Sequence, residues 1–119
     1  MATLPKSGTP KFPRRATASL RAVLQFRRAH AFWHFRAFDR SIPLLEDLIQ
    51  EHPHHPITEL GGALLLDSLA GTGRRAQLSM WLDLFVHMPG FLDDKPSLRN
   101  TVREYRRRYL EPRIGNENC

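Results

Sequence analysis

Histidines are the first residues in this chain of 119 residues whose spacing could support chemistry. His30 and His34 are one helical turn apart, which is the spacing that lets two imidazoles on one helix reach a single zinc ion. The residues between them are Ala31, Phe32 and Trp33, so the glutamate of a zinc-protease motif is missing and no third ligand follows. We therefore expect one histidine at the surface and the other beside an aromatic ring, without a metal.

A second group of histidines lies in a short stretch punctuated by prolines. His52, His54 and His55 fall within the run HPHHP at residues 52–56. Histidine-rich tracts bind metal in some proteins, but this tract has the composition of a link between two helices, so we expect it to be solvated. His87 lies near a predicted helix end, where it interacts favourably with the negative end of the helix dipole.

Nucleotide-binding and nucleophilic motifs are also incomplete. The segment GTGRR at residues 71–75 has glycines, but it lacks the GxxxxGK[ST] spacing of a phosphate loop and no strand is predicted before it. Serine, histidine and aspartate are present without a nucleophile elbow. We predict no catalytic residue, no metal ligand and no cofactor, and therefore no enzyme.

Arginine gives the strongest electrostatic signal. The chain has a formal net charge of +6 at pH 7 and a sequence pI near 10.4, so it attracts polyanions such as nucleic acid, anionic lipid or an acidic protein face. The last predicted helix contains five arginines: Arg99, Arg103, Arg106, Arg107 and Arg108. The alternative to a binding surface is a solvated outer helix face.

An aromatic run precedes the middle of the chain. Exposed rings at Phe32, Trp33, Phe35 and Phe38 would stack nucleic-acid bases, with neighbouring arginines on the phosphates. Rings at helical spacing usually face inward, however, and we expect these to pack in the core.

Two amphipathic helices between Pro56 and Met88 form the centre of the predicted fold, separated by the break GTG at residues 71–73. The first has its apolar residues at Leu60, Leu64, Leu65 and Leu69. The second has them at Leu78, Trp81, Leu82, Phe85 and Met88 and is followed by Pro89 and Gly90. Gly61 and Gly62 weaken a helix, so we expect another backbone to pass close to them.

Three further helices complete an all-α fold. The first is expected from Ala16 to Phe38, with a bend or break near Arg27 and Arg28 because its apolar patches need not share one stripe. The patches are Leu20, Val23 and Leu24, and then Ala31, Phe32, Phe35 and Phe38. Asp39 or Ser41 is expected to cap the next helix, which buries Leu44, Leu45, Leu48 and Ile49. The last runs from Pro96 towards Pro112 with Leu98, Val102, Tyr105 and Tyr109 on one face.

Length and composition fit one helical domain, expected over residues 15–111. Residues 1–14 are expected to form a disordered basic tail because prolines and polar residues dominate, and residues 112–119 a disordered C-terminal tail. We find no signal peptide and no apolar run long enough to span a membrane, so we expect a cytoplasmic protein. The single cysteine, Cys119, leaves no intrachain disulfide.

The helices contain a weak repeat. LLEDLIQEHP at residues 44–53 aligns with MWLDLFVHMP at residues 80–89, which places Asp47 opposite Asp83 and Leu48 opposite Leu84. This offset of 36 residues is close to the roughly 34-residue period of tetratricopeptide repeats.

On these residues the chain resembles the tetratricopeptide repeat family over about residues 29–109, and residues 64–89 are similar to segments of bacterial members. The resemblance implies stacked helical hairpins. Its first unit would use Phe32, Ser41, Leu45, Leu48 and Pro53, its second Leu65, Trp81, Leu84 and Pro89, and residues 98–109 would form the solvating helix. Ser41 and Gln77 replace the usual alanine, Pro43 intrudes, and Arg36 or Ala37 replaces the usual turn glycine.

The resemblance also implies protein binding through the concave surface of the first helix of each pair. We expect a non-enzymatic module that binds an acidic or extended protein segment at Gln25, Arg28 and Phe32 and at the arginine face of Arg99, Arg103, Arg106 and Arg107. The alternative is a small basic nucleic-acid-associated protein that uses the N-terminal tail and residues 103 and 106–108. Two units are fewer than the three usually needed for stability, so the chain either forms a homo-oligomer or is part of a longer array.

Overall fold

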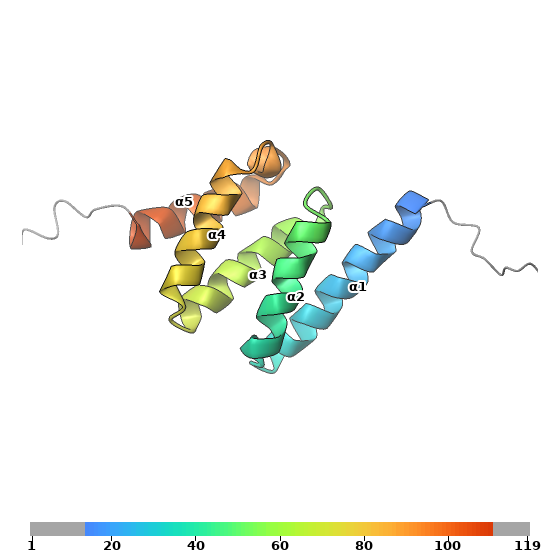
Figure 1. Ribbon diagram of the computed structural model, residues 1–119, viewed down its shortest axis with the longest axis horizontal. Helices are drawn as coiled ribbons and strands as arrows, with labels where there is room; N and C mark the ends of the chain where they lie inside the picture. Colours follow the sequence, from blue (N-terminus) through green and yellow to red (C-terminus); the bar gives the residue numbers. More distant parts are fainter. Residues whose placement is uncertain (1–13, 111–119) are drawn as a thin grey trace, which may run out of the picture.

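The computed structural model describes residues 14–110, and within that range it contains α-helices and one 3₁₀ helix but no strand (Figure 1). The predicted all-α fold is therefore confirmed. The elements are α1 Arg14–His34, α2 Phe38–Glu51, α3 Ile57–Gly71, α4 Arg75–His87, η1 Phe91–Asp94 and α5 Pro96–Tyr109. The short η1 was not predicted, and the tails expected from sequence lie outside the described residues apart from Arg14, which begins α1.

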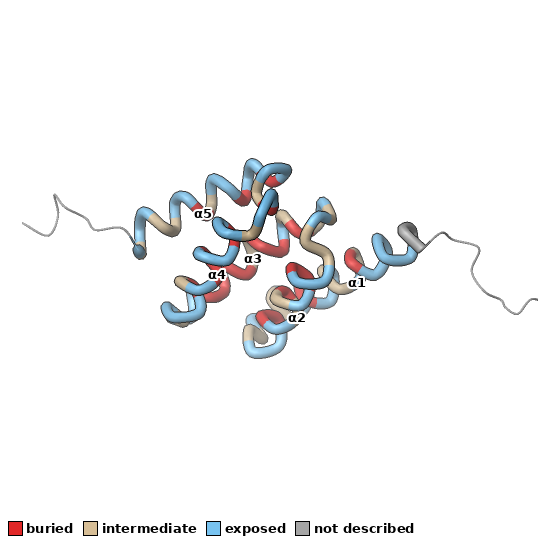
Figure 2. Tube along the Cα trace, turned by 45° about the horizontal axis from the view of Figure 1, so that its top comes forward, coloured by how far each residue is buried: buried red, intermediate tan, exposed pale blue. Residues whose placement is uncertain are grey.

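The helices follow one another in chain order along a row, with α1 and α5 at its two ends (Figure 1). Each helix packs against the next, and α3 also contacts α1 and α5, so antiparallel hairpins are stacked side by side as predicted. Figure 2 shows that buried residues concentrate in α2, α3 and α4, whereas α1 and α5 are mostly exposed or partly exposed.

The core is built from aliphatic side chains of the inner helices and closed by aromatic rings. Phe85 of α4 and Phe91 of η1 stack with their ring centroids 5.1 Å apart, and both are buried. Burying each such large apolar side chain contributes about 1.5–3 kcal/mol, which makes this packing the main source of stability. The other large members are Ile42, Leu45, Ile49, Leu65, Leu66, Leu69, Leu78, Trp81, Leu82, Leu98 and Val102.

The two glycines of α3 lie against side chains of the neighbouring helices. A Cβ atom on Gly61 would lie 2.6 Å from Cδ2 of Leu48 in α2, and one on Gly62 would lie 2.7 Å from Cδ2 of Leu98 in α5. The predicted close approach is confirmed, but the prediction of a neighbouring backbone was wrong. Leucine side chains fill the space that the glycines leave.

The turn inside each hairpin has the same geometry twice. Arg36 and Gly73 both adopt a positive φ, of 62° and 75°, and the residue after each has φ −86° and ψ 67°. The amide of Ala37 donates to the carbonyl of Phe32, and the amide of Arg74 donates to that of Leu69. The two hairpins are therefore structurally equivalent at positions 37 residues apart.

This equivalence corrects the register expected from sequence. The first residues of α2 and α4 are 37 positions apart, but their last residues are 36 apart because α4 is one residue shorter. Leu48 is matched in burial by Phe85, both fully buried, whereas Leu84 is 39% exposed. Pairing Leu48 with Leu84 was therefore wrong, because the alignment was anchored on the helix ends.

Replacing Arg36 with glycine is expected to stabilise the protein by about 1 kcal/mol. A side chain at positive φ is strained by roughly 1–2 kcal/mol, and glycine removes that strain, as the equivalent Gly73 does. Urea unfolding of Arg36→Gly measures the change, and Gly73→Arg is the matched reverse substitution, expected to destabilise. An unchanged midpoint in both variants would show that the turn stores no strain.

The start of α2 differs from the prediction. Ala37 is the N-cap residue and no side chain caps the helix, so capping by Asp39 or Ser41 was wrong. The helix begins earlier because Arg36 already turns the chain at positive φ. Ser41 instead faces the core, where its Oγ is buried and has no hydrogen-bond partner within the described part of the chain.

Replacing Ser41 with alanine is expected to raise the free energy of unfolding by about 1 kcal/mol. The substitution removes a buried hydroxyl that has lost its hydrogen bonds to water, and alanine also has the higher helix propensity. Thermal unfolding measures this, with Ser79→Ala on the half-buried face of α4 as control. A lower melting temperature for Ser41→Ala would mean that the hydroxyl is satisfied.

Helix α1 is continuous from Arg14 to His34, so the expected break near Arg27 and Arg28 was wrong. Two small residues, Ala22 and Ala29, are fully buried on its inner face and let the helix pack without a bend. Three residues of the predicted apolar patches are largely exposed because they lie away from this face: Leu20 is 57%, Leu24 56% and Phe35 79% exposed. Core packing was expected of Phe35, and that prediction was wrong. Leu60 of α3 is also 57% exposed, which corrects its expected burial.

Candidate functional site

Three of the predicted arginines come together at the α5 end of the row. Arg99, Arg103 and Arg106 line a pocket of about 220 Å³ between α4, η1 and α5. The apolar part of its lining is Val86 of α4, Leu92 of η1 and Val102 of α5. Sequence analysis found the arginines but missed Val86 and Leu92, which belong to elements that only the tertiary fold brings next to α5.

We call this pocket, lined by Arg99, Arg103 and Arg106, the end pocket. Its three arginines differ in their hydrogen-bond and ion-pair partners. Arg106 pairs with Asp83 of α4 at 3.2 Å, and Arg99 donates to the carbonyl of Leu92 at 3.3 Å. Arg103 is exposed and has no hydrogen bond or ion pair among residues 14–110. One cation is therefore free and a second is bound only to a neutral carbonyl, so the pocket has an excess of positive charge.

The end pocket is the position where a further helix pair would stack. Buried positions of α3 recur in α5 37 residues later, as Gly61 and Leu98 show, and as Leu65 and Val102 show. At the same offset, the arginines of the pocket correspond to Gly62, Leu66 and Leu69, which are all buried. Leu98 of α5 and Phe85 of α4 lie against Gly62. In α5, arginines thus lie at the positions that are buried in α3.

The other predicted arginines of α5 lie on a different side and are engaged. Arg107 donates to Glu104 and holds the pKa of that carboxyl below its ordinary value, and Arg108 donates to the same carboxylate at 3.4 Å. Glu104, Arg108 and Tyr105 line a second, more open pocket of about 390 Å³. Burial is the main cause that raises the pKa of Tyr105, and the hydrogen bond that its hydroxyl donates to Asp67 is the second cause.

The predicted groove at the first helices is occupied by α2. Gln25 donates to Glu51 at 3.1 Å and its oxygen bonds the ring of His52 at 2.9 Å. Phe32 is half-buried, with the guanidinium of Arg40 5.7 Å from its ring centroid. Arg28 alone of the three is exposed, whereas Gln25 and Phe32 contact residues of α2 and of the link that follows it.

The histidines act mainly as hydrogen-bonding and stacking groups. His55 accepts from the amide of Ile57 at 3.0 Å and bonds Ser19 at 2.9 Å, while His30 stacks between Phe26 and Trp33. Within residues 14–110, no group of three or more His, Cys, Asp or Glu side chains is placed to hold a metal ion.

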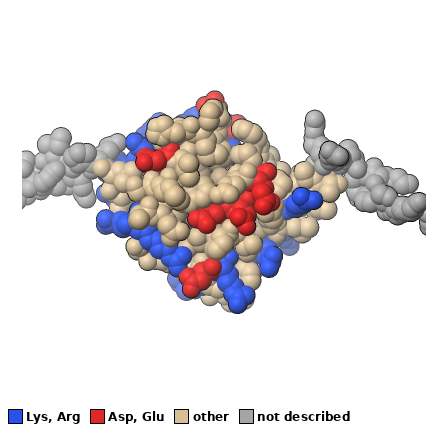
Figure 3. Space-filling model, in the orientation of Figure 1, with Lys and Arg blue, Asp and Glu red and all other residues tan. Residues whose placement is uncertain are grey.

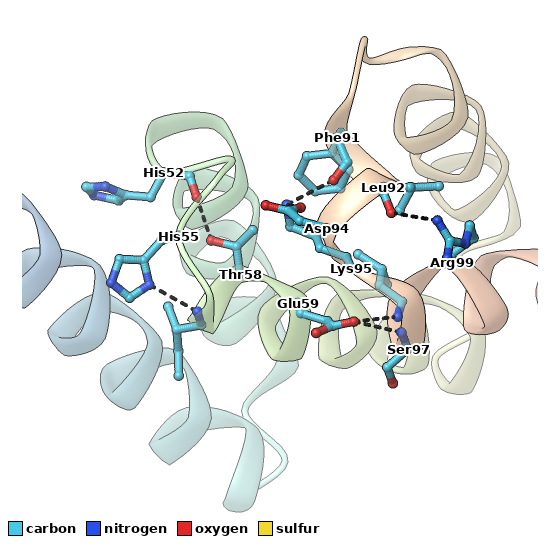
Figure 4. A network of polar contacts seen from close by, with 12 residues as sticks. His52, His55, Thr58, Glu59, Phe91, Leu92, Asp94, Lys95, Ser97 and Arg99 are labelled. Atoms are coloured by element: carbon cyan, nitrogen blue, oxygen red, sulfur yellow. Dashed lines mark hydrogen bonds and ion pairs between the residues drawn. The ribbon is translucent and has the colours of Figure 1, made fainter.

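Glu59 of α3 fixes the helix that contains the arginines. Its Oε2 accepts hydrogen bonds from the amides of Ser97 at 2.7 Å and Leu98 at 3.1 Å, in the first turn of α5 (Figure 4). These amides have no partner inside their own helix, and the carboxylate also interacts favourably with the positive helix end. A side chain from the preceding hairpin thus supplies the cap of α5.

Replacing Glu59 with alanine is expected to lower the free energy of unfolding by about 1–2 kcal/mol, because two amides lose their acceptor. Glu59→Gln keeps an oxygen acceptor and is expected to lose less than half as much. Chemical unfolding of both variants measures the effect. Equal losses would show that the negative charge, and not the hydrogen bond, is responsible.

Lys95 closes the link between η1 and α5 from inside. It is 1% exposed, its ammonium donates to the carbonyl of Phe91 and to Asp94, both at 3.0 Å, and it lies 4.1 Å from the centroid of the Phe91 ring (Figure 4). The hydrogen bond from Lys95 is the main cause that lowers the pKa of Asp94. These contacts of the buried cation fix η1, which contains the pocket residue Leu92.

Charge is unevenly distributed over the molecule. On the face seen in Figure 3, the largest group of carboxylates lies near the middle, and lysine and arginine side chains lie towards the sides and lower edge. Carboxylates of α2 make contacts across the stack, since Asp39 pairs with Arg74 at 2.6 Å and Glu46 accepts from Trp81 at 2.9 Å. Helices α2 and α3 contain more acidic than basic residues.

Comparisons with protein-family models, with curated proteins and with solved structures found no match to this chain. None of the helices in residues 14–110 is both long and apolar enough to cross a membrane.

Proposed function

We propose that this protein is a non-enzymatic, helical-repeat binding module that receives an acidic segment of another protein in the end pocket. The observation behind the proposal is the free Arg103 beside Arg99 at the edge of an apolar floor. An acidic side chain of the ligand would pair with these cations, and an apolar neighbour would cover Val86, Leu92 and Val102.

A protein ligand is favoured over nucleic acid because the end pocket has an apolar floor and because most arginines of α5 already have partners. A phosphate backbone needs a row of free cations and gains nothing from an apolar floor. Arg106, Arg107 and Arg108 already pair with carboxylates, and the last two lie outside the end pocket. We therefore keep nucleic acid as an outcome of the test.

We also propose that the chain is a degenerate tetratricopeptide-like array. Support comes from the twice-repeated turn, with Arg36 equivalent to Gly73, and from helix pairs that recur every 36 or 37 residues. Cross-stack hydrogen bonds have a similar spacing of 36 residues between Ser19 and His55 and 35 residues between Asp39 and Arg74. A scaffold or adaptor role follows from such an array because its surfaces bind and do not react.

The test is a fluorescence-anisotropy titration of the full chain with a labelled peptide rich in aspartate and leucine. A matched peptide with lysine in place of aspartate and a single-stranded oligonucleotide of the same net charge are the comparisons. We expect saturable binding of the acidic peptide alone, weakened by salt. Tighter binding of the oligonucleotide, with a steep salt dependence, would replace the proposal with the nucleic-acid function.

A further inference from the structure

Helix α1 has an apolar outer face at the opposite end of the row from the end pocket. Leu20 and Leu24 are more than half exposed, Ala31 follows on the same side, and Phe35 is exposed just past the helix end. The residues recur at helical spacing of four, seven and four positions, so they form one stripe. The α1 stripe, as we call these residues, lies opposite the buried Ala22 and Ala29.

The internal repeat identifies what this stripe is equivalent to. At the offset of 37 residues, Leu24 corresponds to Gly61 and Ala31 to Ser68, and both α3 residues are buried. A Cβ on Gly61 would meet Leu48, so α2 covers this face of α3. Among residues 14–110, the α1 stripe is therefore the same face without a covering helix.

The two ends of the row of helices differ in the polarity of their exposed residues. End faces of repeat stacks are normally polar, because no further unit covers them. The α5 end follows this rule with Arg99, Arg103 and Arg106, whereas the α1 end exposes two leucines. An exposed apolar stripe on an end face marks a docking surface.

Charge defines the chemistry of the occupant. Arg27 and Arg28 are exposed and interrupt the stripe, and α1 contains no acidic residue. The helix that covers the equivalent face of α3 is acidic, since α2 contains Asp39, Glu46, Asp47 and Glu51 with Arg40 as its one cation. We propose that the α1 stripe binds an amphipathic helix of another protein. This helix has acidic residues on both sides of its apolar face.

Two other occupants fit less well. In a two-fold dimer the same patch meets itself, which would bring the arginines of two α1 helices together without any carboxylate. Residues 1–13 contain lysine and no acidic residue, so they cannot supply the complementary charge. The shape adds a further condition: Leu24 stands where α3 has Gly61, so the docked helix needs a small residue opposite it.

The test uses full-length protein with Arg99→Glu and Arg103→Glu, so that the end pocket is silenced and the two sites are read separately. The probe is a labelled helical peptide of glutamate, alanine and leucine with leucine on one face. Leu20→Ser with Leu24→Ser is the test variant. The matched control is Met80→Ser with Leu84→Ser, which changes two exposed apolar residues one turn apart on α4.

We expect the Leu20 and Leu24 variant to bind the peptide at least tenfold more weakly, the α4 control to bind as the parent does, and a lysine version of the peptide not to bind. Equal affinity of all variants would overturn the proposal. Sedimentation of the wild-type chain as a dimer that the Leu20 and Leu24 variant abolishes would also overturn it, because the occupant would be a second copy. Failure of the end pocket to bind acidic peptide would leave this result unaffected.

Discussion

Gly62→Leu is expected to lower the free energy of unfolding by about 3 kcal/mol, the largest stability effect we predict for one substitution. A Cβ at this position would lie 2.7 Å and 3.2 Å from the two methyl carbons of Leu98 and 3.5 Å from Cζ of Phe85. Both neighbours are fully buried, so neither can move aside without disturbing the core. The gain in helix propensity, about 1 kcal/mol, is too small to offset this overpacking.

Gly71→Leu is the matched control, because Gly71 belongs to the same helix and no atom lies within 4 Å of where its Cβ would be. We expect this variant to be as stable as the wild type or about 0.5 kcal/mol more stable. Urea unfolding followed by circular dichroism measures both. If Gly62→Leu were no less stable than Gly71→Leu, then α3 and α5 could not pack as closely as the structure shows.

Reversing two charges of the end pocket is expected to have the largest effect on binding. Each pairing of a ligand carboxylate with a guanidinium contributes about 1.5–3 kcal/mol to binding. The double variant Arg99→Glu with Arg103→Glu is therefore expected to lower the affinity for the acidic peptide by at least a hundredfold. Neither arginine is buried or ion-paired within the described residues, so the fold should tolerate both changes. Fluorescence anisotropy measures the loss.

Arg107→Glu is the control for this variant. Arg107 is on the same helix and is also exposed, but it pairs with Glu104 and does not line the end pocket. Arg107→Glu makes the same change in net charge as Arg103→Glu alone, so a general electrostatic attraction would respond equally to these two single substitutions. Similar losses in Arg107→Glu and in Arg103→Glu alone would contradict a localised site, whereas a loss confined to Arg103→Glu would support it.

The helices themselves could be predicted because their apolar residues recur at helical spacing. Leu78, Trp81, Leu82 and Phe85 were expected on one face of α4, and all four are buried. The same method failed for Leu60, because α3 has apolar residues on nearly every side and periodicity cannot say which side is free. Neighbouring helices decide that, and they leave Leu60 exposed.

Turn geometry and register could be predicted only in part. Gly73 was expected to turn the chain, but nothing in the residue type of Arg36 indicates that it adopts the same positive φ. Only the equivalence with Gly73 shows it. The one-residue difference in length between α2 and α4 likewise cannot be seen in an alignment without gaps, and it displaced the expected partner of Leu48 from Phe85 to Leu84.

The candidate site was predictable in its charges and not in its shape. The arginines at positions 99, 103 and 106 share one side of a helix by their spacing, which sequence alone can show. Their floor also needs Val86 of α4 and Leu92 of η1, which lie next to α5 only through the tertiary packing of these elements. Two other predicted binding residues, Gln25 and Arg107, donate hydrogen bonds to carboxylates of this chain, which the sequence alone could not show.

The most direct test of binding at the end pocket is a chemical-shift map of the ¹⁵N-labelled full chain titrated with the peptide of aspartate and leucine. We expect saturable shifts at the amides of Val86, Leu92, Arg99 and Val102, and none at Gln25 or Phe32. Shifts at the first helices without any at the α5 end would contradict binding at the end pocket, as would the absence of any shift at a saturating peptide concentration.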